Sequence, residues 1–182
     1  MLNQDLFFTY KYTLRFILIN KYGTLLNTYN IPKINKLLFF FSFKKLEDLD
    51  DIELYNCFYL FKFFFGRNAF FSKTKSSYFL GKWYYNMNVQ LILNKNFDIH
   101  YILYYYLNNI IYNIDKTFFK KGFFGKNMNI FFFLVKDVNV FSELKTNLGL
   151  FNLQQPLNLN IYLTGCDNNK NLNKLFINLF KF

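Results

Sequence analysis

The apolar residues of this chain come in short runs, and this limits the fold more than any other feature of the sequence. Runs rich in Phe, Leu, Ile and Val lie at 37–41, 68–72, 88–93 and 130–135, and none of these is longer than six residues. A run of this length is typical of a covered β-strand, whereas a membrane-spanning helix needs about 20 mostly apolar residues. The sequence therefore predicts four strands at these places.

A fifth strand is predicted from strict alternation in residues 157–164, LNLNIYLT. Leu157, Leu159 and Ile161 share one face of this segment, and Asn158, Asn160 and Tyr162 share the other. Successive side chains of a strand point to opposite faces, so this pattern indicates a strand with one polar side.

Helical spacing occupies the intervals between the strands. Four helices are predicted, at 5–22, 52–66, 98–113 and 169–180, and Asp167 or Asn168 is expected to start the last. The acidic pair Asp50 and Asp51 precedes the second helix and Gly66 closes it, while Asn96 or Asp98 is expected to cap the third. Strands joined by long loops, with helices between them, predict an α+β fold: a single, mainly antiparallel sheet of about five strands with helices packed on one face. One domain is expected over 1–182, with the N-terminal helix at 5–22 and the sheet and helices at 31–180.

A membrane protein is the alternative to weigh, because 53% of the residues are hydrophobic. The two best candidate spans fail, since 52–66 is short and contains Glu53 and Lys62, and 97–114 contains Asp98 and His100. No stable membrane insertion is expected. A membrane-associated organellar protein or an accessory subunit of a respiratory complex stays open as an alternative.

The net charge of +11 and the pI near 9.5 indicate an anionic partner such as a nucleic acid. The sequence is rich in Phe, Tyr, Ile, Asn and Lys, with Ala69 as its single alanine, and these are residues of AT-rich codons. We interpret this as the bias of an organellar genome. No targeting peptide is predicted, which fits synthesis inside the organelle.

Two basic segments interrupt the apolar pattern. Residues 71–85, FSKTKSSYFLGKWYY, are predicted to form a long loop between two strands, and residues 115–129, DKTFFKKGFFGKNMN, an open, glycine-punctuated segment. Such segments are either solvated or in contact with phosphate, and composition alone favours the solvated turn for the first. Trp83 either anchors the loop on the sheet or offers a stacking surface to a nucleotide.

Three further stretches match a known pattern: IPKINKL at 31–37, GRNAFFSKTKSS at 66–77 and PLNLNIYLTGCDNNKNLNKLFINLF at 156–180. Together with the order of the elements, they resemble the L-five family of universal large-subunit ribosomal proteins. Residues 122–141 are similar to that family's phenylalanine-glycine segment, which runs into a strand. The resemblance extends from about Phe8 to Phe180 and rests on colinearity rather than on individual identities.

The resemblance implies a non-enzymatic structural protein in the central protuberance of the large ribosomal subunit, here that of a mitochondrial ribosome in the matrix. The implied partners are large-subunit rRNA, 5S rRNA, neighbouring ribosomal proteins and, transiently, the P-site tRNA. The residues implied in rRNA binding are Lys33, Lys36, Phe40, Arg67, Gln90, Lys120, Lys121 and Lys126. The residues implied in the loop that faces tRNA are Lys73, Thr74, Lys75, Ser76, Ser77, Gly81, Lys82 and Trp83.

Three of these positions depart from the family pattern. The family has Asn on the first strand, Gln before the second and Thr on the third, where this chain has Phe40, Arg67 and Gln90. A phenylalanine ring cannot hydrogen-bond as Asn does, so Phe40 is expected to stack on a base or to contact another protein. The substitution puts the contact with 5S rRNA in question, and organellar ribosomes of several lineages have lost that RNA.

No catalytic set, metal site or cofactor is predicted. His100 is the single histidine and has no Ser or Cys partner at a motif spacing. Cys57 and Cys166 stand alone and are expected to be small packing residues. Charge at a helix start explains Asp50 and Asp51 without a metal ion.

Overall fold

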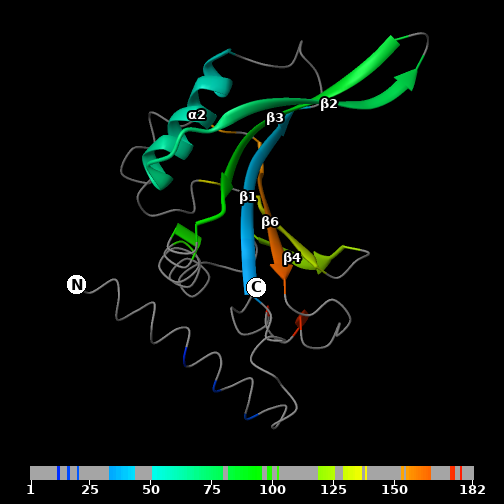
Figure 1. Ribbon diagram of the computed structural model, residues 1–182. Helices are drawn as coiled ribbons and strands as arrows, with labels where there is room; N and C mark the ends of the chain where they lie inside the picture. Colours follow the sequence, from blue (N-terminus) through cyan, green and yellow to red (C-terminus); the bar gives the residue numbers. More distant parts are fainter. Residues whose placement is uncertain are drawn as a thin grey trace.

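In the part of the chain that the computed structural model describes, six antiparallel strands form one sheet (Figure 1), as expected for the predicted α+β class. In chain order they are β1 (Lys33–Phe43), β2 (Phe70–Phe79), β3 (Lys82–Leu93), β4 (Phe119–Phe124), β5 (Ile130–Val135) and β6 (Leu157–Thr164). Across the sheet their order is β2-β3-β1-β6-β5-β4. The helix α2 (Asp51–Phe65) packs on one face of the sheet.

The structure describes residues 12, 16, 20, 33–43, 51–79, 82–95, 98, 99, 102, 119–125, 129–136, 138, 153, 155–164, 173, 174 and 177. Of the other predicted helices, the described residues are helical: Tyr12, Phe16 and Asn20 in the first, Asp98, Ile99 and Ile102 in the third, and Asn173, Lys174 and Ile177 in the last. The remainder of these helices lies outside the described residues. Within the described part, none of the helices combines the length and apolar character that crossing a bilayer requires.

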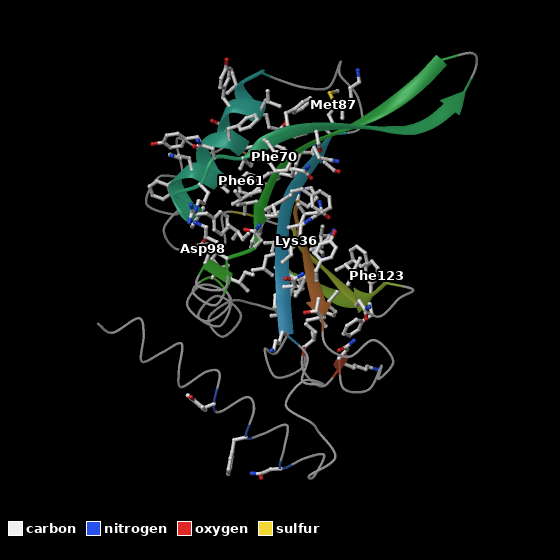
Figure 2. The ribbon with its side chains drawn as sticks, viewed as in Figure 1. Lys36, Phe61, Phe70, Met87, Asp98 and Phe123 are labelled. Atoms are coloured by element: carbon white, nitrogen blue, oxygen red, sulfur yellow. The ribbon has the colours of Figure 1, made fainter. Side chains whose placement is uncertain are left out.

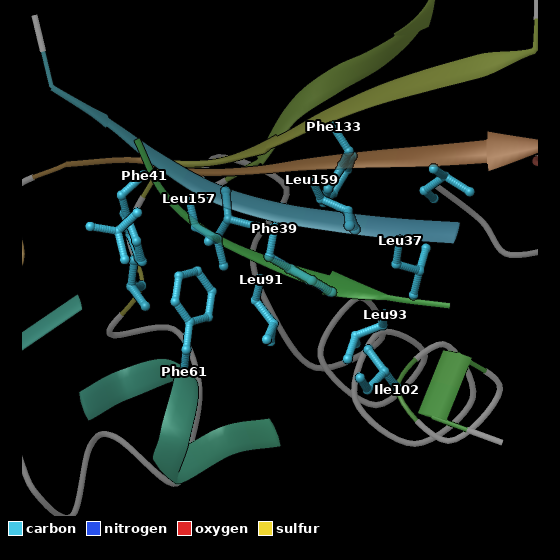
Figure 3. Packing of buried hydrophobic residues seen from close by; sticks show 14 of the residues in the cluster. Leu37, Phe39, Phe41, Phe61, Leu91, Leu93, Ile102, Phe133, Leu157 and Leu159 are labelled. Atoms are coloured by element: carbon cyan, nitrogen blue, oxygen red, sulfur yellow. The ribbon is translucent and has the colours of Figure 1, made fainter. Parts of the chain in front are cut away.

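The core lies between α2 and the sheet face that we call the core face. β1 alternates along its length, so that Leu37, Phe39 and Phe41 are buried on this face. Rings from the helix meet them there: the Phe41 and Phe61 centroids are 5.4 Å apart, and those of Phe39 and Phe65 are 4.7 Å apart. Figure 3 shows Phe61 pointing from α2 toward this layer. The apolar runs of the sequence thus correspond to strands whose core face is buried.

The prediction of two short strands joined by a long loop at 71–85 is wrong. β2 and β3 continue through this stretch as the two arms of one hairpin, separated by two residues, with Lys75 opposite Tyr85 and Tyr78 opposite Trp83. The arms extend beyond the rest of the sheet (Figure 1). Pairing between the arms satisfies the backbone groups on their facing edges, and water can satisfy those on the outer edges, so the strands persist without the apolar alternation that burial would impose.

A second correction concerns residues 115–129, which were expected to form an open segment. Phe119–Phe124 is β4, an edge strand that pairs with β5 through Lys120 opposite Leu134 and Phe123 opposite Phe132. The register shifts between these two pairs. Among the described residues the sheet therefore has six strands rather than about five.

Gly66 ends α2 in the left-handed region, at a φ of 60°, and its amide donates to the Lys62 carbonyl oxygen at 3.0 Å. No heavy atom lies within 4 Å of the place where a Cβ would stand, so an alanine here would meet backbone strain and no collision. We expect Gly66→Ala to lower the free energy of unfolding by about 1 kcal/mol. Urea titration monitored by circular dichroism measures this, and an unchanged midpoint would contradict it.

Candidate nucleic-acid interface

The side of the sheet opposite α2, which we call the open face, carries a mixture of rings, carboxamides and hydroxyls. It comprises Phe70 and Ser72 of β2, Asn88, Gln90 and Ile92 of β3, Lys36, Leu38, Phe40 and Ser42 of β1, Asn158, Asn160 and Tyr162 of β6, and Ile130, Phe132 and Leu134 of β5. Except for the largely buried Asn160 and the exposed Phe70, these side chains are partly exposed. In Figure 2 Lys36 and Phe123 lie across the sheet from Phe61, which belongs to the core.

One row of the open face crosses four strands. Phe70 lies opposite Gln90, Gln90 opposite Phe40, and Phe40 opposite Asn158. Rings and carboxamides thus alternate across neighbouring strands, about 5 Å apart at each step. The carboxamide of Asn158 is held in place because its Nδ2 donates to the carbonyl oxygens of Phe40 and Pro156, both at 3.4 Å. The structure therefore brings together Phe40 and Gln90, which were singled out in the sequence, and adds Phe70 and Asn158.

Two cross-strand pairs flank this row. The Ser42 hydroxyl donates to Asn88 Oδ1 at 2.5 Å. Lys36 Nζ lies 5.1 Å from the centroid of the Tyr162 ring, within the range of a cation–π contact. This contact positions the Lys36 charge on the open face, where the resemblance implied an rRNA contact.

A stacked pair of rings, Phe123 and Phe132, lies at the β4 side of the open face. Their centroids are 5.2 Å apart with an interplanar angle of 25°, and 60% of Phe123 is exposed. A Cβ at Gly125 would stand 3.0 Å from Phe132 Cε2, so the glycine makes room for this ring. Sequence reasoning missed the pair, since without β4 nothing placed the two rings side by side.

The residues implied in tRNA contact lie along the β2–β3 hairpin. Lys73, Thr74, Lys75, Ser76 and Ser77 belong to β2, and Lys82 and Trp83 begin β3. Lys73 is exposed, the others are described by their backbone alone, and Gly81 lies outside the described residues. The set thus occupies a protruding two-stranded arm, and the alternative roles of Trp83 stay open.

The remaining implied rRNA contacts are scattered. Lys33 is exposed at the start of β1, and Lys120 and Lys121 lie on the edge strand β4. Lys126 lies outside the described residues. Arg67 is already paired, since its Nη2 donates to Asp98 Oδ2 at 2.9 Å.

The described residues contain no group of three His, Cys, Asp or Glu side chains that could hold a metal ion. Cys57 is fully buried against the core, as the packing interpretation predicted. Burial, and secondarily the charge of Glu53, raise the pKa of its thiol far above the ordinary value.

Because the thiolate is the reactive form of cysteine, we expect Cys57 to resist thiol reagents in the folded protein at pH 8, where an exposed cysteine reacts. The raised pKa keeps the thiol protonated through the pH range in which a free cysteine ionises. Ellman's reagent, applied to a Cys166→Ser variant with and without urea, measures this. Rapid labelling without urea would contradict it.

Comparison with known proteins adds no relative: no family model and no curated protein matches the chain. The function is therefore inferred from the open face, the hairpin, the charge and the sequence features described above.

Proposed function

We propose that this chain is a structural, non-enzymatic RNA-binding protein of the large subunit of a mitochondrial ribosome. The observation that carries the proposal is the row Phe70, Gln90, Phe40 and Asn158 on the open face, in a chain of net charge +11. The ribosomal setting, the central protuberance and the location in the mitochondrial matrix follow from the resemblance to the L-five family and from the codon bias.

The open face has the chemistry of a surface for unpaired bases. Aromatic side chains stack on bases, and carboxamides hydrogen-bond with base edges. Stacking contributes about 1–3 kcal/mol per base. The positive charge supplies the affinity for phosphate that does not depend on sequence.

The hairpin gives this protein a second RNA contact. A basic two-stranded arm that protrudes from the sheet can reach a backbone that the open face does not touch, and by resemblance this is the P-site tRNA. The Phe40 ring takes the place of the family's Asn, which favours large-subunit rRNA or a neighbouring ribosomal protein over 5S rRNA as the partner of that position.

The proposal is tested by lysing organelles in detergent and separating them on sucrose gradients at low and high salt. We expect the chain, identified by mass spectrometry, to sediment with the large ribosomal subunit. Recovery with membranes or with a respiratory complex, and not with the subunit, would overturn the proposal.

A second candidate, a membrane-associated protein or an accessory subunit of a respiratory complex, is favoured by one observation. The outward face of α2 exposes Ile52, Tyr55, Tyr59 and Phe63, which follow one another at helical spacing. An exposed apolar stripe commonly marks an interaction site. In the gradient experiment this candidate predicts that the chain stays with the membrane fraction after a high-salt wash.

A further inference from the structure

A small pocket lies where β2 begins and β3 continues past it. β2 starts at Phe70, opposite Gln90, whereas β3 runs on to Leu93. Among the described residues, no strand pairs with 91–93 on the side that β2 would occupy. The overhang of β3 thus forms one wall of a cavity of about 210 Å³.

Besides the carboxylate of Asp98 and the β3 residues Leu91, Ile92 and Leu93, groups of three kinds line this pocket. Phe70 contributes a ring that is 42% exposed, Asn68 and Asn94 contribute carboxamides, and Arg67 and Lys95 contribute positive charge. The Asn68 carboxamide is oriented by Lys62, whose Nζ donates to Asn68 Oδ1 at 3.0 Å.

The ion pair between Arg67 and Asp98 in the pocket lining gives the pocket a defined electrostatic character. Asp98 neutralises Arg67 and holds the guanidinium in place, at 2.9 Å. Because Asp98 offsets the charge of Arg67, Lys95 gives the lining a single net positive charge. A guanidinium restrained in this way keeps its planar faces for stacking.

We propose that this pocket binds one unpaired nucleotide of the RNA, with the base in the cavity and its phosphate at Lys95. This inference rests on the proposed RNA-binding function and adds the site at which a single base is bound. An aromatic ring, a guanidinium plane and carboxamides are the groups with which proteins hold a splayed-out base. The cavity is smaller than the about 300–1,000 Å³ of pockets for drug-sized ligands, which suits one base better than a larger cofactor.

The site lies at one end of the row on the open face, next to Phe70. A strand of RNA stacked along Phe40 and Phe70 would bring its next base to the pocket. Figure 2 shows Phe70 and the stacked ring Phe123 well apart, so the two aromatic positions can be tested separately.

The experiment uses the full chain and a single-stranded RNA of ten nucleotides with one 2-aminopurine, with duplex RNA of the same length for comparison. Phe70→Leu removes the ring but keeps an apolar side chain. Phe71→Leu is the matched control, because Phe71 is the next residue, is 44% exposed and is not part of the pocket lining. We expect Phe70→Leu to weaken binding of single-stranded RNA about fivefold or more, and to reduce the change in 2-aminopurine fluorescence that binding produces, while Phe71→Leu changes neither.

Lys95→Gln provides a second readout. It is expected to lower the slope of log affinity against log salt by about one, since one phosphate contact is lost. Equal affinities of the Phe70→Leu and Phe71→Leu variants, in a wild-type chain that binds RNA with a steep salt dependence, would overturn the pocket and remove Phe70 from the RNA-binding row, while RNA binding by the chain would stand. A wild-type chain that binds neither the single-stranded nor the duplex RNA would overturn both the pocket and the proposed RNA-binding function.

Discussion

Replacing Phe61 with alanine is expected to lower the free energy of unfolding by about 3–5 kcal/mol. The ring is fully buried between α2 and the core face, with centroids 5.4 Å from Phe41 and 6.0 Å from Phe65. Alanine would leave a cavity that these neighbours fill only in part. A loss of this size is a large share of the about 5–15 kcal/mol that stabilises most domains, so the urea midpoint should fall steeply.

The matched control is Phe63→Ala, two residues along the same helix. Phe63 is 48% exposed, and its truncation is expected to cost less than about 1 kcal/mol. Both variants change the same residue type in α2, so the difference between them reports burial rather than helix propensity. Similar losses for the two would contradict the placement of Phe61 in the core.

The second large effect is expected in RNA binding when Lys73 and Lys75 are both changed to glutamine. Both lie on β2 in the protruding hairpin, and each neutralised phosphate releases counterions. The slope of log affinity against log salt should therefore fall by about two. Fluorescence titration of the full chain with large-subunit rRNA fragments or tRNA at several salt concentrations measures this slope.

The control for this pair is the double variant Lys136→Gln and Lys174→Gln, which removes the same charge from exposed positions outside the hairpin. For this control, the slope of log affinity against log salt should fall by clearly less than two. If the two double variants change the slope equally, the protein binds RNA through its overall charge and the hairpin has no special role.

The hairpin shows why part of the fold could not be predicted from local pattern. The strands β1, β5 and β6 have one buried face, and burial imposes the alternation or apolar run that makes them recognisable. The segment FSKTKSSYF of β2 carries no such alternation. Its strand conformation depends on pairing between the two arms, for which the sequence has no local signal beyond the Gly81 between them.

The strand β4 was not predicted from the sequence for a related reason. Its sequence, FKKGFF, combines lysines and a glycine, and only one of its two edges is paired. Edge strands commonly carry lysine, which blocks further pairing, so their composition resembles that of a loop. The stacked Phe123 and Phe132 became visible only when the register of β4 on β5 was known.

Of the candidate site, the resemblance singled out Phe40 and Gln90, and only the register shows that they lie opposite each other. Arg67 was also singled out, but nothing in the sequence connected it with Asp98, 31 residues away. The position of Phe70 at the pocket, and the pocket itself, depend on where β2 begins relative to the end of β3. That length difference is a property of strand pairing and not of either segment alone.

The sequence by itself determined which segments could bury one face, which acidic and glycine residues begin and end α2, and that the chain carries a net charge of +11. Periodicity, capping and charge are properties of local residues. Only the tertiary structure decided which rings face each other, which lysines lie on a protruding arm and where a cavity is left. These depend on pairing between segments distant in the chain, since a partly polar strand is stable only when a neighbouring strand satisfies its backbone.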